Sequence, residues 1–167
     1  MKNILFFFAL LLAGNTGTAQ TPANDLDFWL GAWDLRWQDT DSTQATGTNQ
    51  ITRELDGKVI CENFLAQSGQ TAGFAGRSWS VFDQRAQTWK QTWVDSQGSY
   101  LDFTGGREGD TFVFRRRLTG KDGALIQQKM VFHDIQPDQF VWDWMRSDTD
   151  GQTWQLQWRI YYTRRKS

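Results

Sequence analysis

The sequence has little of the chemistry that metal, thiol and histidine sites need. Among its 167 residues there is one cysteine, Cys61, and one histidine, His133. A catalytic zinc site takes about three protein ligands and a structural site about four, so this pair is too small for either. A single cysteine allows no intramolecular disulfide. His133 is the candidate haem ligand, but a lone histidine is more often exposed or hydrogen-bonded, so we expect no metal, no haem and no other cofactor.

Signatures of nucleophilic and nucleotide chemistry are also missing. The sequence has no Gly-x-Ser-x-Gly motif, and a Ser-His-Asp arrangement would depend entirely on His133. No glycine-rich loop leads from a strand into a helix, as a nucleotide site requires. The chain has 18 basic and 19 acidic residues, a balance that gives no indication of a nucleic-acid partner.

One long apolar run is present, and it stands at the N-terminus. Lys2 precedes the run from Ile4 to Ala13, and small residues follow up to Ala19. This order is typical of a secretory signal peptide, and the run is too short to span a bilayer as a helix. We expect cleavage near Ala19, a signal peptide over residues 1–19 and a soluble, periplasmic or secreted domain over residues 20–167. No second such run follows, so we expect no membrane insertion.

The rest of the chain is typical of an all-β protein. It has 2 prolines, 15 glycines and ten tryptophans, with turn signals at regular intervals. A short helical turn is predicted over residues 25–30, before the first strand. Sequential antiparallel strands hide their edges completely by closing into a barrel, which can hold one small ligand. The sequence therefore predicts a single up-and-down antiparallel β-barrel of about ten strands, at residues 31–38, 46–55, 58–67, three within 76–106, 111–118, 124–132, 139–146 and 154–163.

The three central strands carry the candidate site. A two-residue turn centred on Gln97-Gly98 would set Asp95 opposite Tyr100 and Trp93 opposite Asp102. A loop over residues 83–87 that sets Val81 opposite Trp89 would add Arg77 and Trp79 to the same face. Ser78, Ser80, Leu101 and Phe103 would then point outward. The predicted ligand-binding residues on the inner face are Arg77, Gln91, Trp93, Asp95, Tyr100 and Asp102.

A few polar groups among aromatic walls are typical of small-molecule sites. In this interpretation Arg77 anchors a polar or anionic group, Gln91 and the two aspartates orient the ligand, and Trp93 and Tyr100 form walls. Arg77 could equally pair with the aspartates as a structural network, because a buried charge needs a partner.

Two other functions stay open. Asp95 and Asp102 could be the acid and base of a hydrolase. Alternatively, outward Leu101 and Phe103 could form an apolar patch for a protein partner or a homodimer.

The segment Asp27-Phe28-Trp29-Leu30-Gly31-Ala32-Trp33 resembles the FDFW-x-G-x-W opening of a secreted bacterial family of unknown function. The blocks Gly76-Arg77-Ser78 and Tyr100–Gly105 resemble its middle. Arg146-Ser147, Asp150-Gly151, Trp154 and Ile160-x-Tyr162-x-Arg164 resemble its end. More distantly, the Gly-x-Trp motif resembles the calycins, which include lipocalins, fatty-acid-binding proteins and nitrobindins. The resemblance implies a calycin-like barrel in which Trp33 plugs one end beneath an arginine, for which Arg164 is the candidate.

Overall fold

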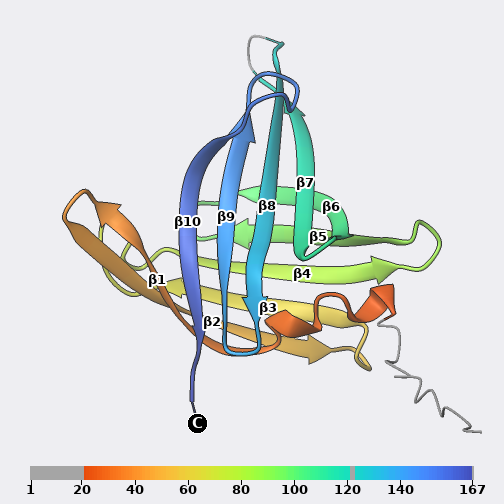
Figure 1. Ribbon diagram of the computed structural model, residues 1–167, viewed down its shortest axis with the longest axis horizontal. Coiled ribbons are helices and arrows are strands. Elements are labelled where there is room, and N and C mark those ends of the chain that lie inside the picture. The colour runs from red at the N-terminus through yellow and green to blue at the C-terminus, as the bar shows by residue number, and fades with distance from the viewer. Residues whose placement is uncertain (1–20, 121–122, 167) are drawn as a thin grey trace, which may run out of the picture.

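The computed structural model describes residues 21–120 and 123–166, which form one closed barrel of ten antiparallel strands (Figure 1). Each strand pairs with the next along the chain, and β1 also pairs with β10. The predicted up-and-down barrel is therefore confirmed, whereas the predicted signal peptide at residues 1–19 lies outside the described residues. The strands are β1 (Gly31–Thr40), β2 (Thr43–Glu54), β3 (Val59–Ala66), β4 (Ala75–Asp83), β5 (Thr88–Asp95), β6 (Tyr100–Glu108), β7 (Thr111–Thr119), β8 (Leu125–Gln136), β9 (Gln139–Ser147) and β10 (Gln155–Arg164).

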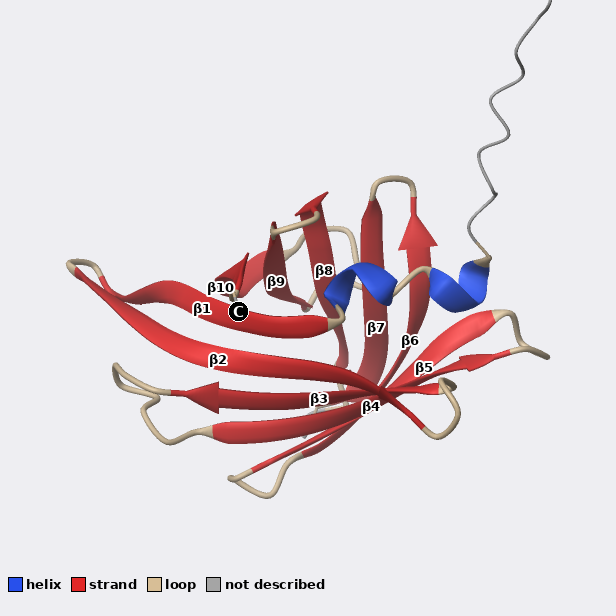
Figure 2. Cartoon of the chain, turned by 90° about the horizontal axis from the view of Figure 1, so that it is seen from below, coloured by secondary structure: helices blue, strands red, loops and turns tan. Residues whose placement is uncertain are grey.

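Two short 3-10 turns, η1 (Pro22–Asn24) and η2 (Asp27–Trp29), lie across one end of the barrel, which we call the closed end (Figure 2). The predicted helical turn is thus present. The indole Nε1 of Trp89 donates to the carbonyl of Pro22 at 3.0 Å, and Arg107 donates to the carbonyl of Asp25 at 3.1 Å. Within the described part of the chain, no helix is long and apolar enough to cross a membrane.

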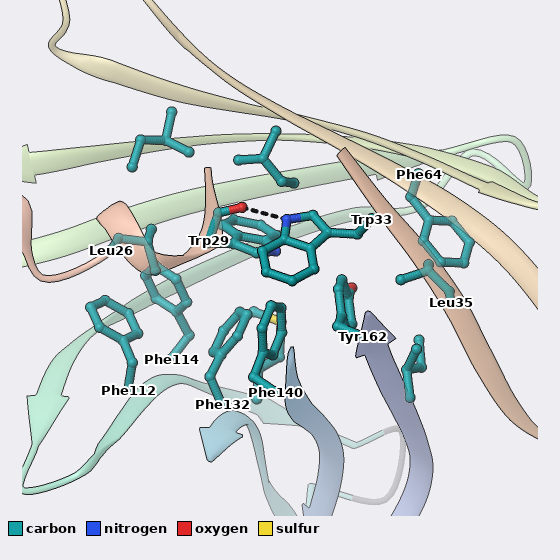
Figure 3. Close-up of a cluster of buried hydrophobic side chains, with 14 of the residues drawn as sticks. Leu26, Trp29, Trp33, Leu35, Phe64, Phe112, Phe114, Phe132, Phe140 and Tyr162 are labelled. Atoms are coloured by element: carbon teal, nitrogen blue, oxygen red, sulfur yellow. Dashed lines mark hydrogen bonds between the residues drawn. The ribbon is translucent and has the colours of Figure 1, made fainter. Parts of the chain in front are cut away.

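A dense aromatic cluster fills the barrel beneath these turns (Figure 3). Strands alternate between inner and outer residues, so every second side chain of β7 and β9 enters the interior. Phe140 stacks on Tyr162 with ring centroids 4.2 Å apart. The Nε1 of Trp33 donates to the carbonyl of Trp29 at 2.7 Å, which holds η2 against the cluster. Tilted and edge-to-face ring contacts join further aromatic side chains, among them Phe28, Phe112, Phe114 and Phe132.

Arg164, near the end of β10, covers Trp33 as predicted. Its guanidinium carbon lies 4.1 Å from the centroid of the Trp33 ring. The same guanidinium donates to the carbonyls of Leu30 at 2.8 Å, Phe28 at 3.4 Å and Pro137 at 2.8 Å. One side chain thereby joins the first strand, the last strand, the segment before β1 and the β8–β9 hairpin.

The alternation of inner and outer residues along β10 is interrupted near the start of the strand. The pairing with β9 shifts register between Leu156 and Trp158. Such a bulge inserts an extra residue and reverses the alternation on one side of it. Leu156 is consequently 47% exposed, while Ile160 and Tyr162 point inward, and Trp154 precedes the strand.

We predict that Arg164→Lys lowers the free energy of unfolding by about 2–3 kcal/mol, because lysine cannot make the forked hydrogen bonds or stack on the indole in the same way. Urea denaturation followed by circular dichroism measures this loss.

The matched control is Arg165→Lys at the next residue. Arg165 is paired with Asp34 on the exposed surface, so its replacement should cost less than about 1 kcal/mol. If both variants lose the same free energy of unfolding, the contact of Arg164 with Trp33 does not stabilise the fold beyond an ordinary surface interaction.

Candidate functional site

The barrel is hollow away from the closed end. A cavity of about 210 Å³ extends from Trp29 and Phe132 towards the opposite, distal end of the barrel, where loops 41–42, 67–74, 96–99 and 148–154 lie. The side chains nearest the distal loops, such as Trp93, Trp144 and Trp158, are only partly buried. The cavity is lined by Trp29, Glu62, Phe64, Phe74, Gln91, Trp93, Asp95, Leu101, Phe103, Met130, Phe132, Trp142, Trp144, Trp158, Ile160 and Tyr162.

Aromatic rings make up most of the wall. Trp142 and Trp144 project inward from β9 with nearly parallel rings, 7° apart in plane and 6.5 Å between centroids. Phe103 meets Trp144 edge-on at 5.8 Å, and Trp158 meets Trp142 edge-on at 6.0 Å. These contacts hold the rings in fixed orientations, so the wall presents both ring faces and ring edges to the cavity.

A buried carboxyl group, that of Glu62, interrupts the apolar wall. It lies on β3 between Ile60 and Phe64, in phase with both, and is 8% exposed. Its Oε1 accepts a hydrogen bond from Asn49 Nδ2 at 2.7 Å, and its Oε2 accepts one from the Ser78 hydroxyl at 2.6 Å. Asn49 on β2 and Ser78 on β4 thus supply hydrogen bonds that the buried carboxyl group of Glu62 would otherwise lack.

The hydrogen-bond network continues on both sides of Glu62. Gln91 Nε2 donates to Ser80 Oγ at 3.0 Å and to Ser78 Oγ at 3.4 Å. On the other side, Asn49 Nδ2 also donates to the Tyr162 hydroxyl at 3.2 Å. We call Asn49, Glu62, Ser78, Ser80, Gln91 and Tyr162 the polar cluster.

Burial raises the pKa of Glu62 to about 7, although the hydrogen bonds from Ser78 and Asn49 and the charge of Arg77 act in the opposite direction. Burial, together with the charge of Glu62, raises the pKa of Tyr162, which keeps its proton at neutral pH. Glu62 therefore changes charge near neutrality inside an aromatic cavity. Perturbed carboxyl groups of this kind are concentrated at functional sites.

Asp95 is the second carboxyl group that lines the cavity. Its Oδ2 accepts from Trp93 Nε1 at 3.0 Å, and its Oδ1 accepts the backbone N–H groups of Gln97 at 2.9 Å and Ser99 at 3.1 Å. Burial acts to raise the pKa of Asp95, but these hydrogen bonds together lower it below the usual value. Asp95 is thus held ionised near the distal loops.

The predicted pairing of β5 with β6 is wrong by one residue. Val94, rather than Asp95, pairs with Tyr100, and Trp93 pairs with Leu101. The cause is the Asp95 side chain, whose bonds to two backbone N–H groups draw Asp95 itself into the turn and lengthen the loop. A slip of one residue moves every side chain of a strand to the other face.

The β4–β5 pairing shifts for the same reason. Asp83 Oδ1 accepts the backbone N–H groups of Arg85 at 2.9 Å and Ala86 at 3.0 Å, so Phe82 rather than Val81 pairs with Trp89. This reverses the predicted faces of β4, and Ser78 and Ser80 are fully buried.

The six predicted site residues therefore divide into two groups. Gln91, Trp93 and Asp95 line the cavity. Arg77, Tyr100 and Asp102 are exposed on the outer face, and Asp102 pairs with Thr92 there. The Asp95–Asp102 pair required by the hydrolase interpretation is not assembled, because the two residues lie on opposite faces of the sheet.

The outward apolar patch is also absent from β6. Leu101 and Phe103 line the cavity, and Phe103 is 4% exposed. A dimer formed through these two side chains is not available, because the closed sheet covers them.

Sequence reasoning missed the polar cluster apart from Gln91. Glu62 could have been found, because it alternates with Ile60 and Phe64 in a predicted strand. It also missed Arg116, which is in phase with inward Phe112 and Phe114 on β7. The Arg116 guanidinium lies 5.6 Å from the Phe103 ring centroid, and its Nε and Nη1 are buried without a hydrogen-bond partner.

His133, the one candidate haem ligand, does not line the cavity. Its Nδ1 lies 2.9 Å from Asp134 Oδ2 and its Nε2 lies 3.2 Å from Asp143 Oδ2. Arg159 donates to both oxygens of Asp143, at 2.7 and 2.6 Å. Residues 21–120 and 123–166 contain no group of three or more His, Cys, Asp and Glu placed to hold a metal ion.

Comparison with known proteins adds little to this geometry. No sequence-family model matches the chain, and no curated protein matches it. Among solved structures, a redesigned β-barrel is similar over 88% of this chain and 100% of that chain, with 10% sequence identity and a TM-score of 0.46. A likeness of this size carries no argument about family or function. The barrel assignment rests on the strand pairing, and the resemblance to the secreted family and to calycins stays a prediction.

We predict that Glu62→Gln removes part of the pH dependence of stability. The pKa of Glu62 is raised, so this group contributes full stability below its ordinary pKa of 4.5 and loses that contribution as the pH rises through about 7. Across this window the wild-type protein should lose about 3 kcal/mol more unfolding free energy than the variant.

Urea denaturation at several pH values between these limits measures the difference. Glu54→Gln, which removes an exposed carboxylate near the end of β2, is the matched control and should keep the wild-type profile. If Glu62→Gln also keeps that profile, Glu62 does not titrate as described.

The Trp93 indole lies directly over Gly76. A Cβ atom at Gly76 would meet ring atoms of Trp93 at 2.0 Å, whereas one at Gly106 would meet nothing within 4 Å. We predict that Gly76→Ala displaces the indole and costs about 1–3 kcal/mol, as overpacking does in other cores. Gly106→Ala should change stability little. Urea denaturation with near-ultraviolet circular dichroism tests both, and a silent Gly76→Ala would contradict the placement of Trp93.

Proposed function

We propose that this protein binds one small, largely apolar molecule inside the barrel. The observation that carries the proposal is a cavity of about 210 Å³ whose wall is aromatic and yet contains the polar cluster at Glu62. A barrel selected for stability alone would gain by filling this space, because voids forfeit packing contacts.

The size of the cavity limits the ligand. A dry apolar cavity of about 150 Å³ can hold one benzene molecule, so the space here suits a single ring with a short substituent. The rings of Trp93, Trp142 and Trp144 would contact the apolar body of the ligand. The polar cluster would bind its polar group and fix its orientation.

This proposal keeps Gln91, Trp93 and Asp95 as ligand-binding residues and replaces Arg77, Tyr100 and Asp102 by Glu62, Trp142 and Trp144. We retain export to the periplasm or the cell exterior, after removal of residues 1–19, as part of the proposal. Binding alone needs no nucleophile and no cofactor.

Native mass spectrometry of the protein purified from the cells that make it tests the proposal. We predict a non-covalently bound small molecule in the wild-type protein. Leu101→Trp should abolish its binding, because Leu101 lines the cavity and a larger ring would fill it. Tyr100→Trp is the matched control, since the adjacent Tyr100 side chain is 68% exposed on the outer face and its replacement should leave binding intact.

A second measurement detects binding even if the natural ligand is lost during purification. Uptake of 2-phenylethanol, 2-phenylethylamine and phenylacetate by the empty protein can be followed through the fluorescence of the cavity tryptophans. A wild-type protein that is isolated empty and takes up none of the three, or a Leu101→Trp variant that binds as well as the wild type, would contradict the proposal.

A further inference from the structure

The charges that line the cavity have one sign. Glu62 and Asp95 contribute carboxyl groups, and the described lining includes no lysine, arginine or histidine. Asp95 is held ionised by its hydrogen bonds with Trp93 and the following turn. The electrostatic potential in a low-dielectric cleft lined by one sign of charge favours a ligand of the opposite sign.

Two guanidinium groups that act on residues of the lining, those of Arg77 and Arg116, are not themselves part of it. Arg77 is exposed on the outer face of β4, and its Nη1 donates to the carbonyl of Gly76 at 2.8 Å. Arg116 lies over the Phe103 ring, and its Nε and Nη1 are buried without a hydrogen-bond partner. Neither group is among the residues that line the cavity.

The aromatic wall also suits a cation. The face of an indole ring carries negative electrostatic potential, and cations within about 6 Å of such a face are attracted to it. Trp93, Trp142, Trp144 and Trp158 all line the cavity, and the rings of Trp142 and Trp144 lie within 7° of parallel. Indole is the strongest of the aromatic side chains in this respect.

The polar cluster has spare acceptors close to Glu62. The nitrogen donors of Asn49 and Gln91 and the Ser78 hydroxyl are committed to other members of the cluster. Each Glu62 oxygen accepts one such bond, although a carboxylate has about four acceptor positions. Asn49 is 1% exposed, and its Oδ1 has no partner. A ligand that donates several hydrogen bonds would complement this arrangement.

From these observations we infer that the bound molecule is a small organic cation, an ammonium group on an aromatic or other apolar body. The ammonium donates to Glu62, and the body lies between the tryptophan rings. This inference rests on the proposed function and specifies the chemical class of its ligand.

Binding of an ammonium group depends on the protonation state of Glu62. Asn49 on β2 and Ser78 on β4 donate hydrogen bonds to Glu62, while Tyr162 on β10 and, from the outer face of β4, Arg77 interact with it electrostatically. Of the two ionisable groups of the cluster, Tyr162 keeps its proton at neutral pH, so Glu62 is the one that titrates there. An ammonium group binds the ionised carboxylate, and its affinity therefore rises as the pH rises through the pKa of Glu62.

Three probes of matched shape test the charge preference. They are 2-phenylethylamine, 2-phenylethanol and phenylacetate, which carry one ring and, at neutral pH, a positive, a neutral and a negative polar group. Isothermal titration calorimetry on the wild-type protein should give the tightest binding for the amine, by at least about tenfold over the alcohol. Amine affinity should rise at least about tenfold from about pH 5.5 to about pH 8.5, because the amine stays protonated over this range.

Glu62→Gln is the decisive variant, because glutamine keeps the size of the side chain and removes its charge. It should abolish both the preference for the amine over the alcohol and the pH dependence, while 2-phenylethanol still binds. Glu54→Gln makes the same change of net charge on the exposed surface and should behave as the wild type.

Several results would overturn the inference. If wild-type protein binds 2-phenylethanol or phenylacetate as tightly as the amine, the cavity binds small molecules without the proposed charge preference, and the proposed function stands alone. If the amine preference persists in Glu62→Gln, the carboxyl group does not determine it. If none of the three probes binds and the protein is isolated empty, the inference and the proposed function fail together.

Discussion

The contact of the Arg164 guanidinium with the Trp33 ring joins the two ends of the sheet. It lies where β1 meets β10, at 4.1 Å from the ring centroid, and the same group binds the carbonyls of Leu30, Phe28 and Pro137. A sheet of ten strands has no exposed edges only if its first and last strands pair. The stacked guanidinium also fixes the segment that carries η2, so that Trp29 and Leu26 cover the closed end. This closure places Trp29 where it bounds the cavity on the side of the closed end.

From the closed end to the distal end, the interior changes from packed to hollow. Near η2, rings such as Phe132 and Phe140 meet at 5.8 Å and fill the space between the strands. Towards the distal loops, Trp142 and Trp144 stand against open volume instead. The polar cluster lies on the wall of that volume. A carboxyl group such as Glu62, with a pKa raised to about 7, costs stability at neutral pH, and stability sacrificed at one position is a frequent mark of a functional site.

The hollow interior and the buried carboxyl group support one another as evidence of binding. In a tightly packed interior, a buried Glu62 would have no ligand to contact. In a purely apolar cavity, no polar group would fix the orientation of a ligand. Here the carboxyl group is held by Asn49 and Ser78 from the two adjacent strands, while tryptophan rings surround the space it faces. Specificity in such a site comes from the few polar groups, because apolar contacts discriminate poorly between molecules of similar size.

Local sequence determined a large part of this protein. Alternating side chains and turn residues predicted the ten strands, the up-and-down order and the short helical turn, because strand periodicity and turn preference act over a few neighbouring residues. The inward phase of Trp93 and Gln91, which share a face with Trp89, followed from the same rule. Even Glu62 was visible in principle, since its alternation with Ile60 and Phe64 places a carboxyl group among apolar residues.

Only the tertiary structure decided the register in which neighbouring strands pair. Asp83 and Asp95 each bind backbone N–H groups of the turn that follows them, and these bonds turned β4 and β6 over relative to the expected pairing. Arg77 and Asp102 consequently moved outward, and Leu101 moved inward. Whether the aromatic rings fill the barrel or surround a cavity depends on packing between strands distant in sequence, and no pattern within a single strand contains that information.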